Sequence, residues 1–273
     1  MIGGTELPST PYIDVWSLET FDEDLLAILQ THSEVLLNYE LTSWENYQEQ
    51  QAADGWVPLK GNPYASDRAH VLEKIIMPTV ARRSIRAWHY TRLVDEEVDL
   101  MSANGIRLGS LSEIRRRLDQ QVSAGAIPTD IANALYKKSP FHHQEHSRSG
   151  KFWMVSHPHA VNDAGVRLLL DHWGGEGIFF WLEDAAHIEL VQGIGRPRVI
   201  ELVVPVSVTA SAYSAVKAVV STFVMSLGGR PDWSAFDLYT EAPLDAGAVL
   251  DVHTEGDTKF SALASRYPAD FSK

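Results

Sequence analysis

The chain has 273 residues, of which 45% are hydrophobic, 10% aromatic and 22% charged, a balance typical of a globular protein with a buried core. It contains no cysteine, which excludes a disulfide scaffold, a thiolate nucleophile and cysteine-bound metal sites. The formal net charge of −13 argues against broad affinity for nucleic acid or anionic membranes. The sequence does not open with a secretory pattern, and the most apolar run, from Val199, is too short to cross a bilayer. We therefore expect a cytoplasmic protein that makes no membrane contact.

The first part of the chain, residues 1–84, predicts a helical region of its own. Thr20 and Glu23 have the spacing of a capping box before an amphipathic run over 21–40. A second apolar stripe begins at Val71, and Pro78 is expected to end or kink that helix.

A polar pair stands inside the strand predicted over 88–93. A period of two places His89 and Thr91 on one face and Tyr90 and Arg92 on the other. A helix that stops at Asn104-Gly105 and a short strand over 106–108 follow. Polar residues in the middle of a strand favour a strand that faces a ligand.

The rest of the chain alternates helices and strands irregularly. Ser110 with Glu113 is expected to cap one helix, and Thr129 the next, before a polar, histidine-rich loop over 140–150. Strands are predicted over 152–155, 177–182, 198–206, 236–240 and 248–252, and helices over 162–173 and 209–229. This pattern indicates an α+β fold, with a helical region over 1–84 and an α+β domain over 85–273.

Three kinds of side chain in these strands suit a ligand that carries ribose. They are the pair His89 and Thr91, the aromatic strand over 177–182, and the acidic strand over 236–240, whose alternation places Asp237, Tyr239 and Glu241 on one face. Hydroxyls can be bound, a planar ring can be stacked, and a carboxylate can stabilise a developing oxocarbenium ion. The structural alternative is a core histidine with ordinary cross-strand aromatics.

A separate histidine cluster, His142 to His146, contains the string H-x-x-E-H of one class of zinc peptidases. That chemistry requires both histidines on one face of a regular helix, whereas this string is flanked by Ser139-Pro140 and by SRSG. A solvated loop is the competing interpretation, and a metal-dependent hydrolase is the alternative function.

Five segments, taken in chain order, resemble the ADP-ribosyltransferase superfamily, and within it the DarT-like and related bacterial toxin branches. They are WHYTRL at 88–93, GIRL at 105–108, GEGIFFWLEDA from Gly175, RPRVIELVVPVS from Arg196 and FDLYTEAPLDAGAVLDV from Phe236. The resemblance covers about residues 86–253. It implies a split antiparallel β-sheet core with an N-terminal helical extension, and NAD as the substrate.

The resemblance also implies roles for individual residues. His89 would bind ribose hydroxyls of NAD, and Asp237 or Glu241 would supply the catalytic carboxylate. The family usually has Glu there, but the spacing to Pro243 favours Asp237, with Glu241 second. The implied NAD contacts are His89, Tyr90, Thr91, Arg92, Leu108, Ser110, Phe180 and Trp181.

The function that follows is transfer of ADP-ribose from NAD to a protein or nucleic-acid acceptor, in a toxin or anti-phage effector. An antitoxin or another regulatory protein would be its partner. The alternative within the same fold is a non-catalytic protein that binds NAD, another nucleotide or a partner.

Overall fold

Helices and antiparallel strands together form the part of the chain that this computed structural model describes, residues 12–56, 58, 60–231 and 235–266. The α+β class is therefore confirmed. Contacts divide the chain into unit 1, made of 1–86, 205–236 and 269–273, and unit 2, made of 87–204 and 237–268. The predicted division into 1–84 and 85–273 stays a prediction.

Unit 1 is mainly helical. Its described elements are β1 (Tyr12–Ile13), η1 (Leu18–Thr20), α1 (Glu23–Thr31), α2 (Ser33–Ala52), α3 (Ala65–His70), η2 (Val71–Ile76), α4 (Met77–Val80), η4 (Val206–Val208) and α12 (Ala212–Ser226). Helix α12 packs against α2, α4 and η1, and the Thr222 hydroxyl donates to the Val15 carbonyl at 2.7 Å.

The start of α1 differs from the prediction. Asp22, rather than Thr20, caps this helix, because its carboxylate accepts from the Leu25 amide at 2.9 Å. The same carboxylate forms an ion pair with Arg83 at 2.5 Å. Thr20 instead closes the short turn before it, where its hydroxyl donates to the Ser17 carbonyl.

Pro78 does not end its helix but follows an irregular segment. The residues before it, η2, form a π-helix, and α4 continues to Val80. Since proline has no amide hydrogen to donate to the preceding turn, a local change of helical pitch is the expected accommodation.

Unit 2 contains the sheet that positions the candidate site. Strand β2 (Ser84–Leu93) pairs with β1 through its first two residues in unit 1 and then enters unit 2. The strand order is β5-β3-β2-β4-β6, with β3 (Phe152–Val155), β4 (Arg196–Pro205), β5 (Asp237–Thr240) and β6 (Val249–Thr254). Trp88 of β2 is in register with Val155 of β3, which in turn is in register with Asp237 of β5. The predicted strands over 88–93, 152–155, 198–206, 236–240 and 248–252 are confirmed, with ends that shift by a few residues.

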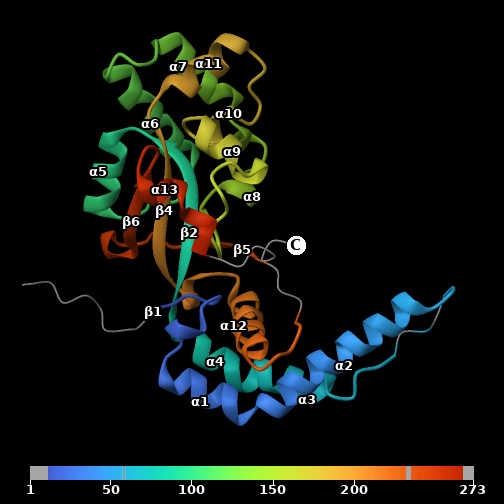
Figure 1. Cartoon of the computed structure of the whole chain (residues 1–273). Helices are drawn as coiled ribbons and strands as arrows, with labels where there is room; N and C mark the ends of the chain where they lie inside the picture. Colours follow the sequence, from blue (N-terminus) through green and yellow to red (C-terminus); the bar gives the residue numbers. More distant parts are fainter. Residues whose placement is uncertain (1–11, 57, 59, 232–234, 267–273) are drawn as a thin grey trace, which may run out of the picture. The chain divides into compact units, whose positions relative to one another are not determined.

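Several helices of unit 2 pack into two hydrophobic clusters. The described helices of this unit are α5 (Asp95–Asn104), α6 (Leu111–Ser123), α7 (Thr129–Lys138), α8 (Glu145–Arg148), α9 (Ala164–Asp171), α10 (Glu176–Phe179), α11 (Ala185–Gly193) and α13 (Thr258–Ser261), with the 3-10 turns η3 (Pro140–His142), η5 (Ala246–Ala248) and η6 (Leu263–Arg266). One cluster, centred on Leu118, Leu135 and Trp173, joins α6, α7, α10 and α11, which Figure 1 shows together at one end of the unit. The other joins Trp88 and Tyr90 of β2 to α9.

The aromatic strand predicted over 177–182 is wrong. The segment forms the short helix α10, which Gly174 and Gly175 introduce with φ values of 85° and 55°. Ile178 is fully buried, and a Cβ at Gly174 would lie 2.3 Å from its side chain. This tight turn folds the chain back on Ile178, so the segment cannot extend as a strand. Phe180 and Trp181 consequently remain 46% and 37% exposed.

Three smaller predictions are also corrected. The short strand over 106–108 is a single bridge between Ile106 and Leu244. Helix α7 has Pro128 rather than Thr129 as its N-cap, since Thr129 is already helical. The loop over 140–150 includes the turns η3 and α8. The predicted cap of α6 is confirmed, because the Ser110 hydroxyl accepts from the Glu113 amide at 3.0 Å.

Candidate functional site

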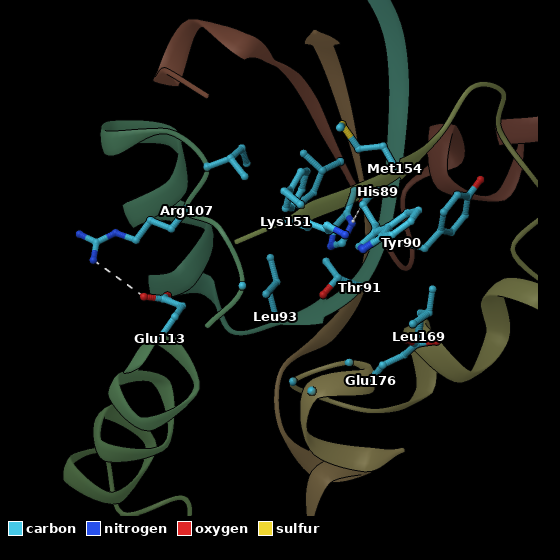
Figure 2. A pocket seen from close by; sticks show the side chains of 18 of the residues that line it. His89, Tyr90, Thr91, Leu93, Arg107, Glu113, Lys151, Met154, Leu169 and Glu176 are labelled. Atoms are coloured by element: carbon cyan, nitrogen blue, oxygen red, sulfur yellow. Dashed lines mark hydrogen bonds and ion pairs between the residues drawn. The ribbon is translucent and has the colours of Figure 1, made fainter. Parts of the chain in front are cut away.

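A pocket of about 870 Å³ opens in unit 2 and contains most of the polar residues that the sequence singled out. Its walls come from β2, β3, the connection between α5 and α6, the first turns of α6, and the glycine turn before α10. Figure 2 shows His89, Thr91, Lys151, Glu113 and Glu176 around this space. The volume lies within the range of about 300–1,000 Å³ that is usual for small-molecule and cofactor sites.

His89 lies in the pocket wall, partly exposed, and its ring is fixed on two sides. Its Nδ1 is 2.8 Å from the Trp153 carbonyl oxygen, and its ring centroid is 4.4 Å from that of Phe152. Burial lowers the pKa of His89 to about 4, and the charge of Arg117 acts in the same direction. The ring is therefore neutral at pH 7. Because a carbonyl can only accept, Nδ1 carries the hydrogen, which leaves Nε2 as a hydrogen-bond acceptor for a ligand hydroxyl.

The neighbours of His89 on β2 have different roles. Thr91 is 6% exposed and lines the pocket. Tyr90 also lines it, but its hydroxyl is engaged by the backbone amide and carbonyl of His159, at 2.6 and 2.8 Å. Burial raises the pKa of Tyr90. Arg92 does not line the pocket; it donates to the Ile194 carbonyl at 2.8 Å, and burial lowers its pKa.

Charges of both signs meet at the start of α6. Arg107, Arg116 and Arg117 line the pocket together with Glu113. Glu113 accepts from Arg116 and lies 3.9 Å from Arg107 (Figure 2). Burial raises the pKa of Glu113, and its arginine neighbours, Arg116 first, outweigh that effect, so the net shift is downward. The three guanidinium groups outnumber the carboxylates of Glu113 and Glu97, so this wall carries net positive charge that suits an anion.

A second carboxylate, Glu97 of α5, lies largely buried in the pocket wall and accepts hydrogen bonds from three groups. It accepts from the Val94 amide at 3.1 Å, the Trp173 indole at 2.9 Å and Arg117 at 2.6 Å. The Arg117 guanidinium also lies 5.0 Å from the Trp173 ring centroid. These bonds connect α5, α6 and the residue before the glycine turn.

The two carboxylates predicted on the acidic strand lie in different places. Asp237, the first residue of β5, is exposed and lines the pocket. Glu241 is not in the strand, which ends at Thr240, and it does not line the pocket. The prediction that alternation in a strand places both on one face is therefore wrong.

The predicted aromatic contacts are not among the residues that line the pocket. Phe180 lies under the Arg148 guanidinium at 4.9 Å, and Trp181 lies 5.7 Å from the His143 ring. Leu108 is also outside the lining, whereas Ser110 belongs to it. Phe141, Phe152 and Trp153 supply the aromatic surface instead.

Sequence reasoning missed Glu176, Glu113, Lys151 and Arg148 as lining residues. The motif Gly174-Gly175-Glu176-Gly177 is visible in the sequence, and an acidic residue inside a glycine turn is a usable signal. Lys151 and Arg148 stand beside a histidine-rich segment, and nothing in their spacing marks them.

The histidine string does not form a metal site in the described residues, where no group of three His, Asp or Glu side chains could hold a metal ion. His142 Nε2 lies 3.0 Å from the Tyr136 carbonyl oxygen. The string is split between the turns η3 and α8, so its histidines do not share a regular helix face.

Comparison with known proteins adds no relative: no family model, no curated protein and no solved structure matches the chain. Among the described helices, none is long and apolar enough to cross a membrane.

Proposed function

We propose that the chain is an NAD-dependent ADP-ribosyltransferase with an ADP-ribosyltransferase-like core in unit 2. One observation carries the proposal: His89 and Thr91, next-but-one neighbours on β2, both line a pocket of about 870 Å³ that also contains guanidinium and carboxylate groups. This combination supports binding of a ligand with ribose hydroxyls, a diphosphate and planar rings.

The pocket groups fit different parts of NAD. The neutral His89 ring offers Nε2 as an acceptor for a ribose hydroxyl, and the buried Thr91 hydroxyl lies two residues further along the strand. Arg107, Arg116 and Lys151 supply positive charge for the diphosphate. The exposed ring of Trp153 offers a stacking surface. Ribose recognition, charge and stacking thus come from three adjacent parts of the pocket wall.

The chemistry requires one bond to break and one to form. The bond from C1′ of the ribose to the nicotinamide nitrogen breaks, and its electron pair leaves with neutral nicotinamide. The acceptor heteroatom then forms a bond to C1′ and releases its proton to solvent. A carboxylate next to the ribose stabilises the oxocarbenium-like transition state. The acceptor is a protein or a nucleic acid, and we propose a toxin or anti-phage role.

NAD binding and turnover by the purified chain test this proposal. NAD at about 100 times its Kd should stabilise the protein by about 2.7 kcal/mol, seen as an increase in Tm. Nicotinamide should appear in solution, and labelled ADP-ribose should join an acceptor in host lysate. Protease and nuclease digestion would identify the acceptor class. The absence of both thermal stabilisation and nicotinamide release would reject the proposal.

The non-catalytic alternative has its own supporting observation. Glu241 lies outside the pocket, and Asp237 is exposed and one methylene shorter than Glu. Thermal stabilisation by NAD without nicotinamide release would favour this alternative.

A further inference from the structure

Four carboxylates line the pocket, and their hydrogen bonds distinguish them. They are Glu97, Glu113, Glu176 and Asp237. Glu97 accepts three hydrogen bonds from two helices and an indole, and Glu113 accepts two from Arg116. Both carboxylates hold protein groups in place, so neither is positioned to receive a ligand.

Glu176 is held at one oxygen and open at the other. Its Oε2 accepts from Arg148, and its side chain is 47% exposed. Among the described residues no other hydrogen bond reaches this carboxylate. Arg148 is itself fixed, because its Nε donates to Gln144 and its guanidinium lies 4.9 Å from the Phe180 ring centroid. One oxygen is therefore oriented by the protein while the other is left for a ligand.

The turn that carries Glu176 is rigidly attached to the pocket wall. The buried Ser139 hydroxyl donates to the Gly177 carbonyl at 2.7 Å. A Cβ at Gly177 would lie 3.2 Å from Ile114 of α6 and 3.3 Å from Phe141. The turn thus lies against the first part of α6, and Figure 2 shows Glu176 at the edge of the same pocket as His89 and Thr91.

The sheet register places Asp237 two strands away from β2. It pairs with Val155 of β3, which pairs with Trp88 of β2. Two strand spacings of about 4.8 Å put its backbone roughly 10 Å from that of Trp88, the residue before His89. Its charge opposes the burial that lowers the pKa of His159, which indicates that it lies near that histidine.

We infer that Glu176, not Asp237 or Glu241, is the carboxylate that contacts the nicotinamide ribose, and that Arg148 is its positioning residue. This inference rests on the proposed function and names a residue for it. Glu176 stabilises the positive charge that develops at C1′ as the bond to nicotinamide breaks, and the electron pair leaves with nicotinamide. Arg148 fixes the carboxylate through Oε2.

The main experiment compares Glu176→Gln with wild type in nicotinamide release and in thermal stabilisation by NAD. Removing one preorganised electrostatic group usually lowers kcat by about 100- to 1,000-fold, so we expect a loss of that size. The shift of Tm with NAD should stay close to that of wild type, which also shows that the variant is folded. Glu176→Asp, with its carboxylate withdrawn by one methylene, should be impaired to an intermediate degree. Glu183→Gln, an exposed acid after the same turn, is the matched control and should retain wild-type kcat.

The positioning role of Arg148 has a separate readout. A misplacement of about 1 Å can cost up to about 100-fold in rate, so Arg148→Met should lower kcat while KM changes little. Arg148→Lys should restore part of the lost kcat. A purely structural role would lower Tm without this division between kcat and KM.

Two results would overturn the inference. In one, Glu176→Gln retains wild-type kcat; in the other, Asp237→Asn abolishes nicotinamide release while Glu176→Gln does not. Wild-type protein that neither binds nor cleaves NAD would reject the proposed function and this assignment with it. NAD cleavage by wild type and by Glu176→Gln alike would reject the assignment alone.

Discussion

His89 lines the pocket and has a pKa well below the ordinary value for histidine. Its pKa is about 4 in the folded chain and about 6.5 in an unfolded one. Between these values the unfolded state binds more protons than the folded state. The contribution of neutral His89 to folding stability is therefore fully present above about pH 6.5 and is lost as the pH falls toward 4. His157, whose pKa burial also lowers to about 4, acts in the same direction.

Replacing His89 should therefore reduce the sensitivity of the protein to acid. We expect the free energy of unfolding of His89→Gln to fall by about 1–2 kcal/mol less than that of wild type between pH 7 and pH 5. Urea unfolding at the two pH values measures this difference. His70→Gln, at an exposed position on α3, is the control and should follow wild type. An equal acid sensitivity of His89→Gln and wild type would contradict a depressed pKa at His89.

The sequence predicts the strand side of the pocket better than the opposite side. Alternation along a single strand is visible in the local sequence, and it singles out His89 and Thr91. The glycine motif marks Glu176 as part of a turn, but its place at the pocket depends on Gly177 packing against Ile114 and Phe141, which are distant in sequence. Packing between residues this far apart leaves no periodic pattern in the sequence.

Among the secondary structure elements around the pocket, Glu97 connects three segments of unit 2. Its carboxylate accepts from the start of α5, from Arg117 of α6 and from Trp173. Removing it leaves a largely buried guanidinium and two N–H groups without this acceptor. The loss of a buried charged partner costs about 3–5 kcal/mol.

We predict that Glu97→Ala lowers the free energy of unfolding by about 3 kcal/mol, measured by urea denaturation. Glu96→Ala is the matched control, since Glu96 is the exposed neighbour on the same helix, and it should change stability by less than about 0.5 kcal/mol. Similar effects of the two substitutions would show that the network around Glu97 contributes little.

The sequence predicts the elements themselves best where the segments are long. The ten-residue strands β2 and β4 and the fifteen-residue helix α12 form where the sequence predicts strands and a helix, although their burial does not follow a strict period. The apolar run around Ile178 predicts a strand, but periodicity alone cannot distinguish a strand from a helix in so short a run. Two glycines at positive φ decide its conformation, and they lie just before the run.

Across the whole chain, the two units are not consecutive in sequence. Unit 1 takes in 205–236 as well as 1–86, so α12 folds with helices that precede it by more than a hundred residues. The sequence offers no signal for this, because α12 looks like any helix in an α+β series. A contact such as that of Thr222 with Val15 appears only in the folded chain.

The arrangement makes a prediction about cutting the chain at its predicted boundary. A fragment of residues 85–273 would retain α12 but lose α2, α4 and η1, against which it packs. Val216, Val219 and Val220 are almost completely buried in the whole chain, and the fragment would expose part of that apolar surface to water. Limited proteolysis with mass spectrometry should therefore show rapid cleavage within α12 in the fragment and protection in the full chain. Cleavage within α6, whose packing partners lie in unit 2, is the internal control and should be equally slow in both. Equal protection of α12 in fragment and full chain would instead support residues 85–273 as an independent domain.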